Sequence, residues 1–404
     1  MSKNADFCDC PRCGAKNPRR PYWTHCVGCG TSLDGRVRRS ESRSRWSEKS
    51  DAGGSRGGTQ RRLGDLRAAW SSMRAVGVIP LLSSLTALGI LAHLLLIHAA
   101  AGPEWMFVCA LFAPRAVWLA PSLTCAAVSA WKRRWAWGAT SLTLVAVVLG
   151  PLMGGMVPWR RLVDTRPTLG HEATMHVMTL NLGLDGVDTS KLTRLIEREH
   201  IDILLFQEGP PEGELLGYLK AHMHVASNGL VASRMPIESE SPPLADNSTT
   251  ERRYTGHLTR VRLKLPEGGT LAAASVHLPT LRQGFKALAR GEAGVLTRHA
   301  LWWESELDRV VETLREDAAT PLIWGGDFNM PAEHPLLAGA AELWPNGFDQ
   351  AGWGFGYTRP SDWPFARIDH ILADPRYRFR SCRVGPDVGS DHLPVIAELE
   401  WVGR

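Results

Sequence analysis

Residues 323–331 read IWGGDFNMP, in which an apolar stretch leads through two glycines to a carboxylate and an amide. Successive side chains of an extended strand point to opposite faces, so Asp327 and Asn329 are expected to share one face. A strand end holds such groups rigidly, as catalysis requires. On this stretch alone, a turn that uses Asp and Asn for local backbone hydrogen bonds is the alternative.

Six more polar residues lie at or near the ends of predicted strands in the C-terminal part: Asn181, Glu208, His277, Asp369, Asp391 and His392. Strands are predicted at 173–183, 201–208, 256–266, 269–279, 320–329, 367–374 and 389–401, and amphipathic helices at 188–200 and 297–317. A single Asp at a strand end is usually a turn former. The recurrence of polar residues at successive strand ends predicts that they share one site.

The first 33 residues contain two C-x2-C pairs, Cys10 with Cys13 and Cys26 with Cys29, and a glycine follows each pair. Four thiolates in this spacing suit a tetrahedral structural Zn²⁺ site. The segment resembles the small zinc ribbons at the N-terminus of many bacterial membrane proteins. We predict a zinc ribbon over 1–33, available to a cytosolic protein partner, with disulfides or free thiols as the alternative.

The next two segments differ in composition. Residues 34–74 are rich in Ser, Gly and Arg and are predicted to form a disordered basic linker. Residues 75–159 contain three apolar stretches, at 75–101, 105–131 and 136–158, and about 20 such residues cross a bilayer. We predict three transmembrane helices flanked by interfacial tryptophans, with a buried helical domain as the alternative.

The positive charges predict an orientation. Residues 1–74 carry 16 Lys and Arg against 7 Asp and Glu, and the WKRRW turn at 131–135 is also basic. The positive-inside rule places both in the cytoplasm of a multi-pass membrane protein. Three crossings then put residues 160–404 on the extracytoplasmic side.

The motifs TLN, FQE, SVHL, GGDFN, RIDHI and GSDHLP occur in this order within residues 172–402. This ordered set resembles the endonuclease/exonuclease/phosphatase superfamily, whose members include DNase I-like nucleases, inositol polyphosphate 5-phosphatases and sphingomyelinases. The resemblance implies a catalytic domain at 170–404 with a four-layered α/β/β/α sandwich. It also implies a phosphoesterase that depends on Mg²⁺ or Mn²⁺.

The resemblance also implies roles for the eight polar residues. Glu208 would be the principal metal ligand, with Asn181 and Asp391 near the metal. Asp327 and Asn329 would position the attacking water, and the glycines would let the strand end approach the phosphate. His392, oriented by Asp369, and His277 would contact the phosphate.

The substrate is predicted to be a lipid-linked phosphate. Residues 170–404 carry 23 Lys and Arg against 32 Asp and Glu, whereas proteins that bind nucleic-acid backbones are usually basic. A tether to the membrane raises the effective concentration of lipid substrates. The arrangement resembles teicoplanin-resistance-associated membrane phosphatases, which implies a polyprenyl pyrophosphate or a similar substrate. The aromatic segment GWGFGYTRPSDWPF at 352–365 could contact lipid, or its rings could belong to the core.

Two alternatives come from other functional classes. One is an extracytoplasmic metal-dependent nuclease, which cleavage of plasmid DNA would reveal. The other is a membrane sensor that uses the C-terminal domain only to bind a ligand.

Overall fold

We analysed a computed structural model of the chain, which describes residues 7–9, 16–18, 77–98, 104–157, 174–183, 186–242, 244 and 257–403. Within the predicted zinc ribbon, strands β1 (Phe7–Asp9) and β2 (Lys16–Pro18) form an antiparallel pair. The four predicted zinc ligands Cys10, Cys13, Cys26 and Cys29 and the linker at 34–74 lie outside the described residues. The zinc ribbon and the linker therefore stay predictions.

The chain divides into two compact units, and the first comprises Met1–Leu94 and Arg115–Leu152. Its helices are α2 (Val78–His98), η1 (Arg115–Trp118), α4 (Leu119–Trp131), α5 (Trp135–Val147) and η2 (Val148–Leu152). The Arg115 guanidinium is buried and donates from Nη1 to the Leu152 carbonyl at 2.9 Å. The charge that interrupts the second apolar stretch is thus accommodated by a backbone acceptor inside this unit.

Within the described residues, two helical stretches are long and apolar enough to cross a membrane, Val78–His98 and Trp135–Leu152. The predicted span at 105–131 is not one helix, because it breaks into α3 (Glu104–Phe112), η1 and α4. Pro114 explains the break, since proline lacks an N–H donor and its ring disfavours helical geometry in the preceding residue. The prediction of three spans holds only if both sides of this break form one span.

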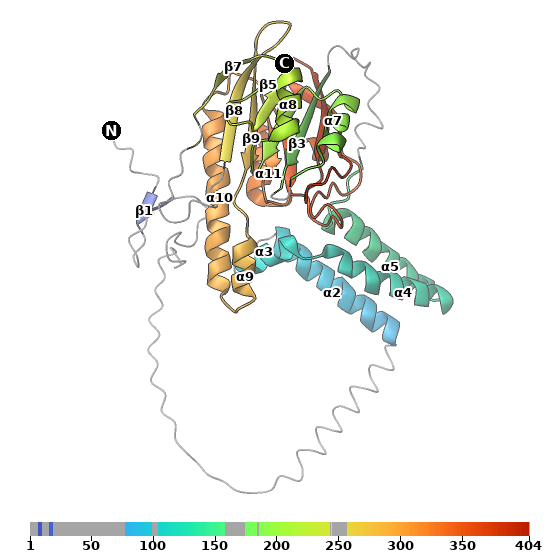
Figure 1. The fold of residues 1–404 in the computed structure, drawn as a ribbon. Coiled ribbons are helices and arrows are strands. Elements are labelled where there is room, and N and C mark those ends of the chain that lie inside the picture. Colours follow the sequence, from blue (N-terminus) through green and yellow to red (C-terminus); the bar gives the residue numbers. More distant parts are fainter. Residues whose placement is uncertain are drawn as a thin grey trace, which may run out of the picture. The chain divides into compact units, whose positions relative to one another are not determined.

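The second unit comprises Leu95–Pro114 and Met153–Arg404 and contains two mixed β-sheets (Figure 1). The six-stranded sheet has the order β12 (Tyr377–Val384), β13 (Val395–Trp401), β3 (Thr174–Asn181), β4 (Ile203–Gln207), β6 (Val231–Ser233), β5 (His224–Val225). The five-stranded sheet has the order β11 (Asp369–Ala373), β10 (Leu322–Asp327), β9 (Thr270–His277), β8 (His257–Lys264), β7 (Ile237–Glu240).

Apolar residues from both sheets, such as Val177, Leu205, Val261 and Ile323, form one buried cluster between them. A second cluster joins the outer face of the six-stranded sheet to α7 (Thr189–Arg198) and α8 (Gly213–His222). Helix α10 (Ala293–Arg315) packs against α9 (Arg282–Leu288) and α11 (Pro335–Leu343), and its Trp303 Nε1 donates to the Phe328 carbonyl just after β10 at 3.0 Å. The short α12 (Gly347–Ala351) packs on β11 and β12. This mixed α/β sandwich agrees with the predicted layer order.

Helix α3 belongs to this second unit. The Phe112 ring lies 5.5 Å from the Phe285 ring and 6.3 Å from the Trp303 ring, and the Phe107 ring lies 5.4 Å from the His334 ring. Val108 and Leu111 are also buried. The second unit therefore extends beyond the segment 170–404 that was predicted as the catalytic domain, because α3 supplies part of its packing.

A buried neutral histidine makes the stability of this unit dependent on pH. His370 donates from Nε2 to the Met330 carbonyl at 2.9 Å, and its Nδ1 lies 3.2 Å from the Asn346 amide nitrogen. Burial, with Arg367 adding to it, lowers the pKa of His370 from 6.5 to about 4. Below pH 6.5 the unfolded chain binds a proton at this residue that the folded chain excludes, so stability falls as the pH falls from 6.5 to 4.

We expect this one residue to lower the free energy of unfolding by about 3 kcal/mol between pH 7 and pH 4. The measurement is thermal unfolding of the full-length protein in detergent across this range, alongside His370→Gln, whose side chain can keep one donor and one acceptor. The variant should lose less stability than the wild type on acidification. Equal losses in both proteins would show that His370 does not carry the effect.

Candidate active site

Strand register brings three of the predicted residues side by side. In the five-stranded sheet, Asp327 pairs with His277 on parallel β9 and with Asp369 on antiparallel β11. In the six-stranded sheet, Asn181 at the end of β3 pairs with Gln207 at the end of β4, and Glu208 follows. Because cross-strand partners point to the same face, these ends form one cluster where the two sheets meet.

The glycines before Asp327 are required by the neighbouring strands. A Cβ atom on Gly326 would lie 1.8 Å from the Val276 carbonyl oxygen, and one on Gly325 would lie 2.6 Å from the His370 carbonyl oxygen. Backbone atoms at these distances cannot give way, so only glycine fits. The structure thus gives these glycines a packing role within the sheet, and their expected close approach to a phosphate stays a prediction.

Asn329 lies beyond the strand and does not extend it. Strand β10 ends at Asp327, and Asn329 has a φ of 46°, in the left-handed region. Its backbone N–H donates to Asp327 Oδ1 at 2.7 Å, and its Nδ2 donates to the Leu278 carbonyl at 2.9 Å. The prediction that Asp327 and Asn329 share one face of an extended strand is therefore wrong. The chain turns after Asp327, because the Asn329 backbone N–H bonds to the Asp327 side chain.

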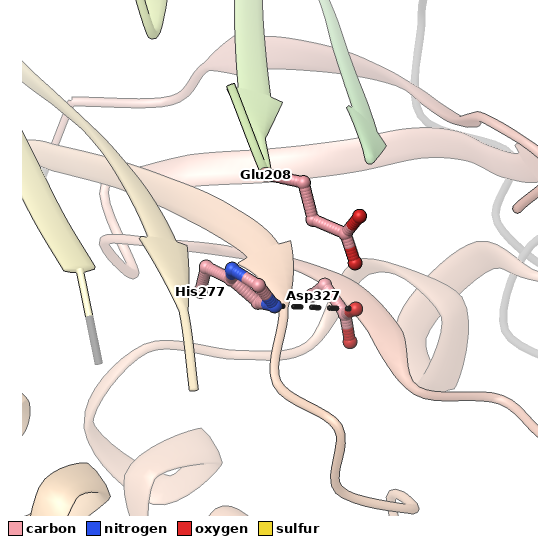
Figure 2. A group of neighbouring side chains, drawn as sticks. All are labelled: Glu208, His277 and Asp327. Atoms are coloured by element: carbon pink, nitrogen blue, oxygen red, sulfur yellow. Dashed lines mark ion pairs between the residues drawn. The ribbon is translucent and has the colours of Figure 1, made fainter. Parts of the chain in front are cut away.

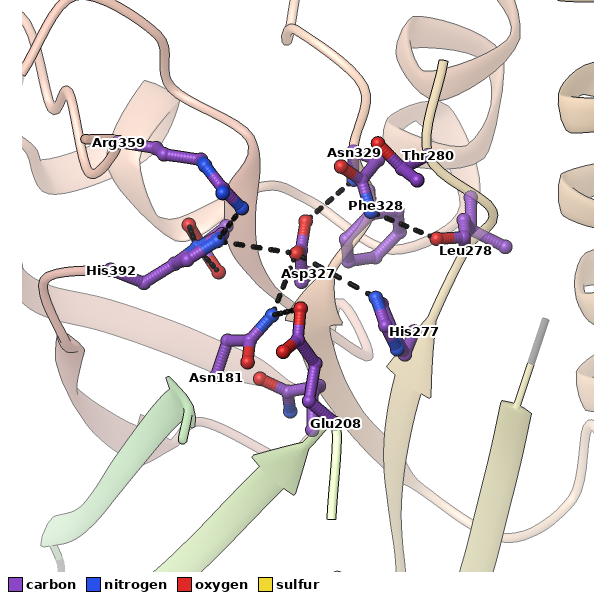
Figure 3. Close-up of polar contacts among 12 residues, drawn as sticks. Asn181, Glu208, His277, Leu278, Thr280, Asp327, Phe328, Asn329, Arg359 and His392 are labelled. Carbon is purple, nitrogen blue, oxygen red and sulfur yellow. Dashed lines mark hydrogen bonds and ion pairs between the residues drawn. The ribbon is translucent and has the colours of Figure 1, made fainter. Parts of the chain in front are cut away.

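Asp327 lies at the centre of the cluster and is inaccessible to solvent (Figure 3). Asn181 Nδ2 donates to Asp327 Oδ2 at 2.9 Å, while His392 Nε2 and His277 Nε2 lie 3.6 and 3.8 Å from the same oxygen. Burial opposes the negative charge, but the two imidazoles and the hydrogen bonds from Asn329 and Asn181 outweigh it and lower the pKa of Asp327. This carboxylate is therefore ionised and can accept a proton or approach a cation.

His392 is held by a chain of hydrogen bonds. Its Nδ1 lies 2.9 Å from Asp369 Oδ2, and Thr358 Oγ1 donates to that oxygen at 2.5 Å. Burial opposes a charged ring, but the charges of Asp369 and Asp327 outweigh it and raise the pKa of His392 to about 9. Such a ring keeps one orientation, in which Nε2 lies 3.6 Å from Asp327 Oδ2 and also contacts the guanidinium of Arg359, whose charge opposes the rise in pKa.

Glu208 contributes the exposed carboxylate of the cluster. Its φ is 69°, and its Oε1 accepts from Asn181 Nδ2 at 3.0 Å. Glu208, His277 and Asp327 each place one ligand atom within 4.8 Å of the others (Figure 2). Two carboxylates with one imidazole, open to solvent on the Glu208 side, fit a divalent cation such as Mg²⁺ or Mn²⁺.

The other two predicted metal neighbours have different surroundings. Asn181 accepts from the Gly183 N–H at its Oδ1 and donates to both carboxylates, so it orients Glu208 and Asp327. Asp391 is half-exposed and forms an ion pair with Arg359, with 2.6 Å between Nη2 and Oδ2. Asp391 is not part of the group formed by Glu208, His277 and Asp327.

Sequence reasoning missed several residues that hold the site together. Gln207 Nε2 donates to Ser275 Oγ at 3.0 Å, and this bond joins the two sheets. Ser390 Oγ donates to the Asn181 carbonyl at 2.6 Å and accepts from the His392 N–H at 3.0 Å. These residues lie within the motifs FQE, SVHL and GSDHLP, and their place next to predicted site residues could have indicated a role in the site. Thr358 and Arg359 lie in an irregular loop and had no such signal.

The chain belongs to the endonuclease/exonuclease/phosphatase family, because the family's sequence profile matches residues 178–392, more than half of the chain. This family consists of metal-dependent hydrolases that act on phosphate esters. All eight predicted site residues fall within the matched segment. A search of curated proteins finds no match.

Several solved structures are similar. An endonuclease/exonuclease/phosphatase family protein from Bacteroides thetaiotaomicron is 17% identical with a TM-score of 0.45, over 58% of this chain and 99% of that one. A mannosyl-6-phosphatase from the same organism is 16% identical with a TM-score of 0.43, over 56% and 100%. Truncated TDP2 from Caenorhabditis elegans is 17% identical with a TM-score of 0.42, over 56% and 98%.

Proposed function

We propose that this chain is a membrane-anchored phosphatase that uses Mg²⁺ to hydrolyse a lipid-linked phosphate ester or pyrophosphate. The observation that carries the proposal is the cluster around Asp327, where carboxylates and imidazoles from both sheets converge. The candidate membrane-spanning helices in the same chain support the anchor. The proposed orientation keeps the N-terminus, with its zinc ribbon and a cytosolic partner, on the opposite side from the site.

Each residue of the cluster has its own role in the proposed hydrolysis. Asp327 accepts the proton of the attacking water, and Asn181 holds Asp327 and Glu208 in place. His392 donates a hydrogen bond or a proton to the phosphate while Asp369 and Thr358 fix its ring. Glu208, His277 and Asp327 would hold the divalent cation, which supplies charge neutralisation on the phosphate oxygens.

Two apolar features beside the site support a lipid-linked substrate. A pocket of about 200 Å³ next to Glu208 and His277 is walled by apolar residues that include Phe206, Pro210 and Leu230. The aromatic loop at 352–365 exposes Trp353, Trp363 and Phe365, of which Trp363 is 79% exposed. Exposed apolar rings in a loop are typical of surfaces that contact lipid or another apolar partner.

The test is phosphate release by the full-length protein in detergent with Mg²⁺. We expect phosphate release from polyprenyl pyrophosphate and loss of activity in excess EDTA. We also expect no conversion of a phosphodiester lipid to its phosphomonoester and no cleavage of plasmid DNA. Cleavage of DNA alone would replace the proposal with the nuclease alternative. Binding of the pyrophosphate without turnover would favour the sensor alternative.

A further inference from the structure

Arg359 brings a permanent positive charge next to His392 in the cluster (Figure 3). Its Nη1 lies 2.5 Å from His392 Nε2, and its Nη2 lies 2.6 Å from Asp391 Oδ2. The Arg359 side chain is 22% exposed, whereas His392 and Asp327 are fully buried. Arg359 is thus a partly exposed cation in contact with the buried His392, where a phosphate bound near His392 could meet it.

The two guanidinium contacts define a fork that matches a phosphate. A guanidinium presents parallel N–H donors and binds two oxygens of one phosphate group, which a lysine ammonium cannot do in the same geometry. Here one donor faces the imidazole nitrogen that points toward Asp327, and the other faces a half-exposed carboxylate. Two phosphate oxygens placed at the mouth of the site could replace both of these partners.

Phosphodiesters and terminal phosphates differ in the number of non-bridging phosphate oxygens that a site can bind. A phosphodiester has two non-bridging oxygens, and the cation site beside Glu208 would engage one of them. A terminal phosphate has three, so it can occupy the cation site and both arms of the fork at once. It also carries about one more negative charge at neutral pH, which strengthens its attraction to a fixed cation.

We propose that Arg359 is a phosphate-binding residue that selects terminal phosphates, in monoesters or pyrophosphates, over phosphodiesters. This inference rests on the proposed phosphoesterase function and narrows its substrate class. The loop position of Arg359 supports a specificity role, since loops on a rigid scaffold often set specificity while the scaffold carries the chemistry.

The test compares kcat/KM for p-nitrophenyl phosphate and bis(p-nitrophenyl) phosphate, using the full-length protein in detergent with Mg²⁺. We expect Arg359→Gln to lower kcat/KM for the monoester by about 100-fold and for the diester by less than about 3-fold. Arg359→Lys should have a kcat/KM for the monoester between those of Arg359→Gln and the wild type. Arg383→Gln, which removes an exposed arginine paired with Glu199 away from the site, is the matched control and should leave both values unchanged.

Equal losses on both substrates would overturn the inference, because they would mean that Arg359 only positions His392 and Asp391. Turnover of the diester without the monoester would also overturn it while leaving a phosphoesterase. If the wild type turns over neither compound nor polyprenyl pyrophosphate, the proposed function fails, and calorimetric titration with inorganic phosphate still tests Arg359. Binding should then be at least about 10-fold weaker in Arg359→Gln, and equal binding would overturn the inference.

Discussion

Asp327→Asn is expected to lower kcat/KM for the phosphate substrate by about 1,000-fold or more, because it removes the proton acceptor from the centre of the site. Asparagine retains an oxygen that can accept from the Asn329 N–H, so the turn after β10 can persist. It loses the negative charge that faces His277 and His392. The measurement is initial-rate kinetics of the full-length variant with Mg²⁺, together with its thermal unfolding.

Asp349→Asn is the matched control for this change. Asp349 pairs with Arg367 at 2.7 Å and is not part of the cluster around Asp327. We expect the control to keep kcat/KM within about 3-fold of the wild type. Wild-type turnover by Asp327→Asn would refute the assigned chemistry, and a collapsed melting temperature would show that the loss reflects folding instead.

Removal of α3 is expected to prevent the catalytic unit from folding stably. Burial of Phe107, Val108 and Leu111 contributes about 1.5–3 kcal/mol for each side chain, and a whole domain is stable by only about 5–15 kcal/mol. A fragment that begins at residue 153 lacks these side chains and exposes the surface around Trp303 and Phe285. We expect it to aggregate when it is expressed alone, as size-exclusion chromatography would show.

A point variant makes the same test within the intact chain. Phe107→Ala should lower the stability of the catalytic unit by about 3 kcal/mol, whereas Leu343→Ala, at a 38% exposed position on α11, should change it by less than about 1 kcal/mol. Thermal unfolding of both full-length variants in detergent gives the comparison. A monomeric, cooperatively melting 153–404 fragment would contradict the role assigned to α3.

The position of the site could be predicted because it follows from strand ends. His277, Asp327 and Asp369 each lie at the limit of an apolar strand, and β-sheet register places such residues beside one another. The helix predicted at 188–200 is also confirmed, and it begins with a cap in which Asp188 accepts from the Lys191 N–H at 3.0 Å. These features depend on patterns that span only a few residues.

Features set by distant segments could not be predicted. Arg359 lies in a loop without periodicity, and only the folded chain brings it to His392 and Asp391. Strand β12 was not predicted, because its several arginines obscure the alternation of apolar and polar residues that marks a strand. In the structure Arg378 and Arg380 form ion pairs with Glu400 on β13. The packing of α3 on Phe285 and Trp303 could not be predicted either, because an apolar stretch gives the same pattern whether lipid or protein covers it.

The division of the chain has a topological consequence. Residues 115–152 leave the catalytic unit at Pro114 and return to it at Met153, so they form an excursion whose two ends are fixed to one body. In a bilayer such an excursion crosses an even number of times, whatever the depth of α4 and α5. Among the described candidate spans, α2 alone then decides whether the total number of crossings is odd or even.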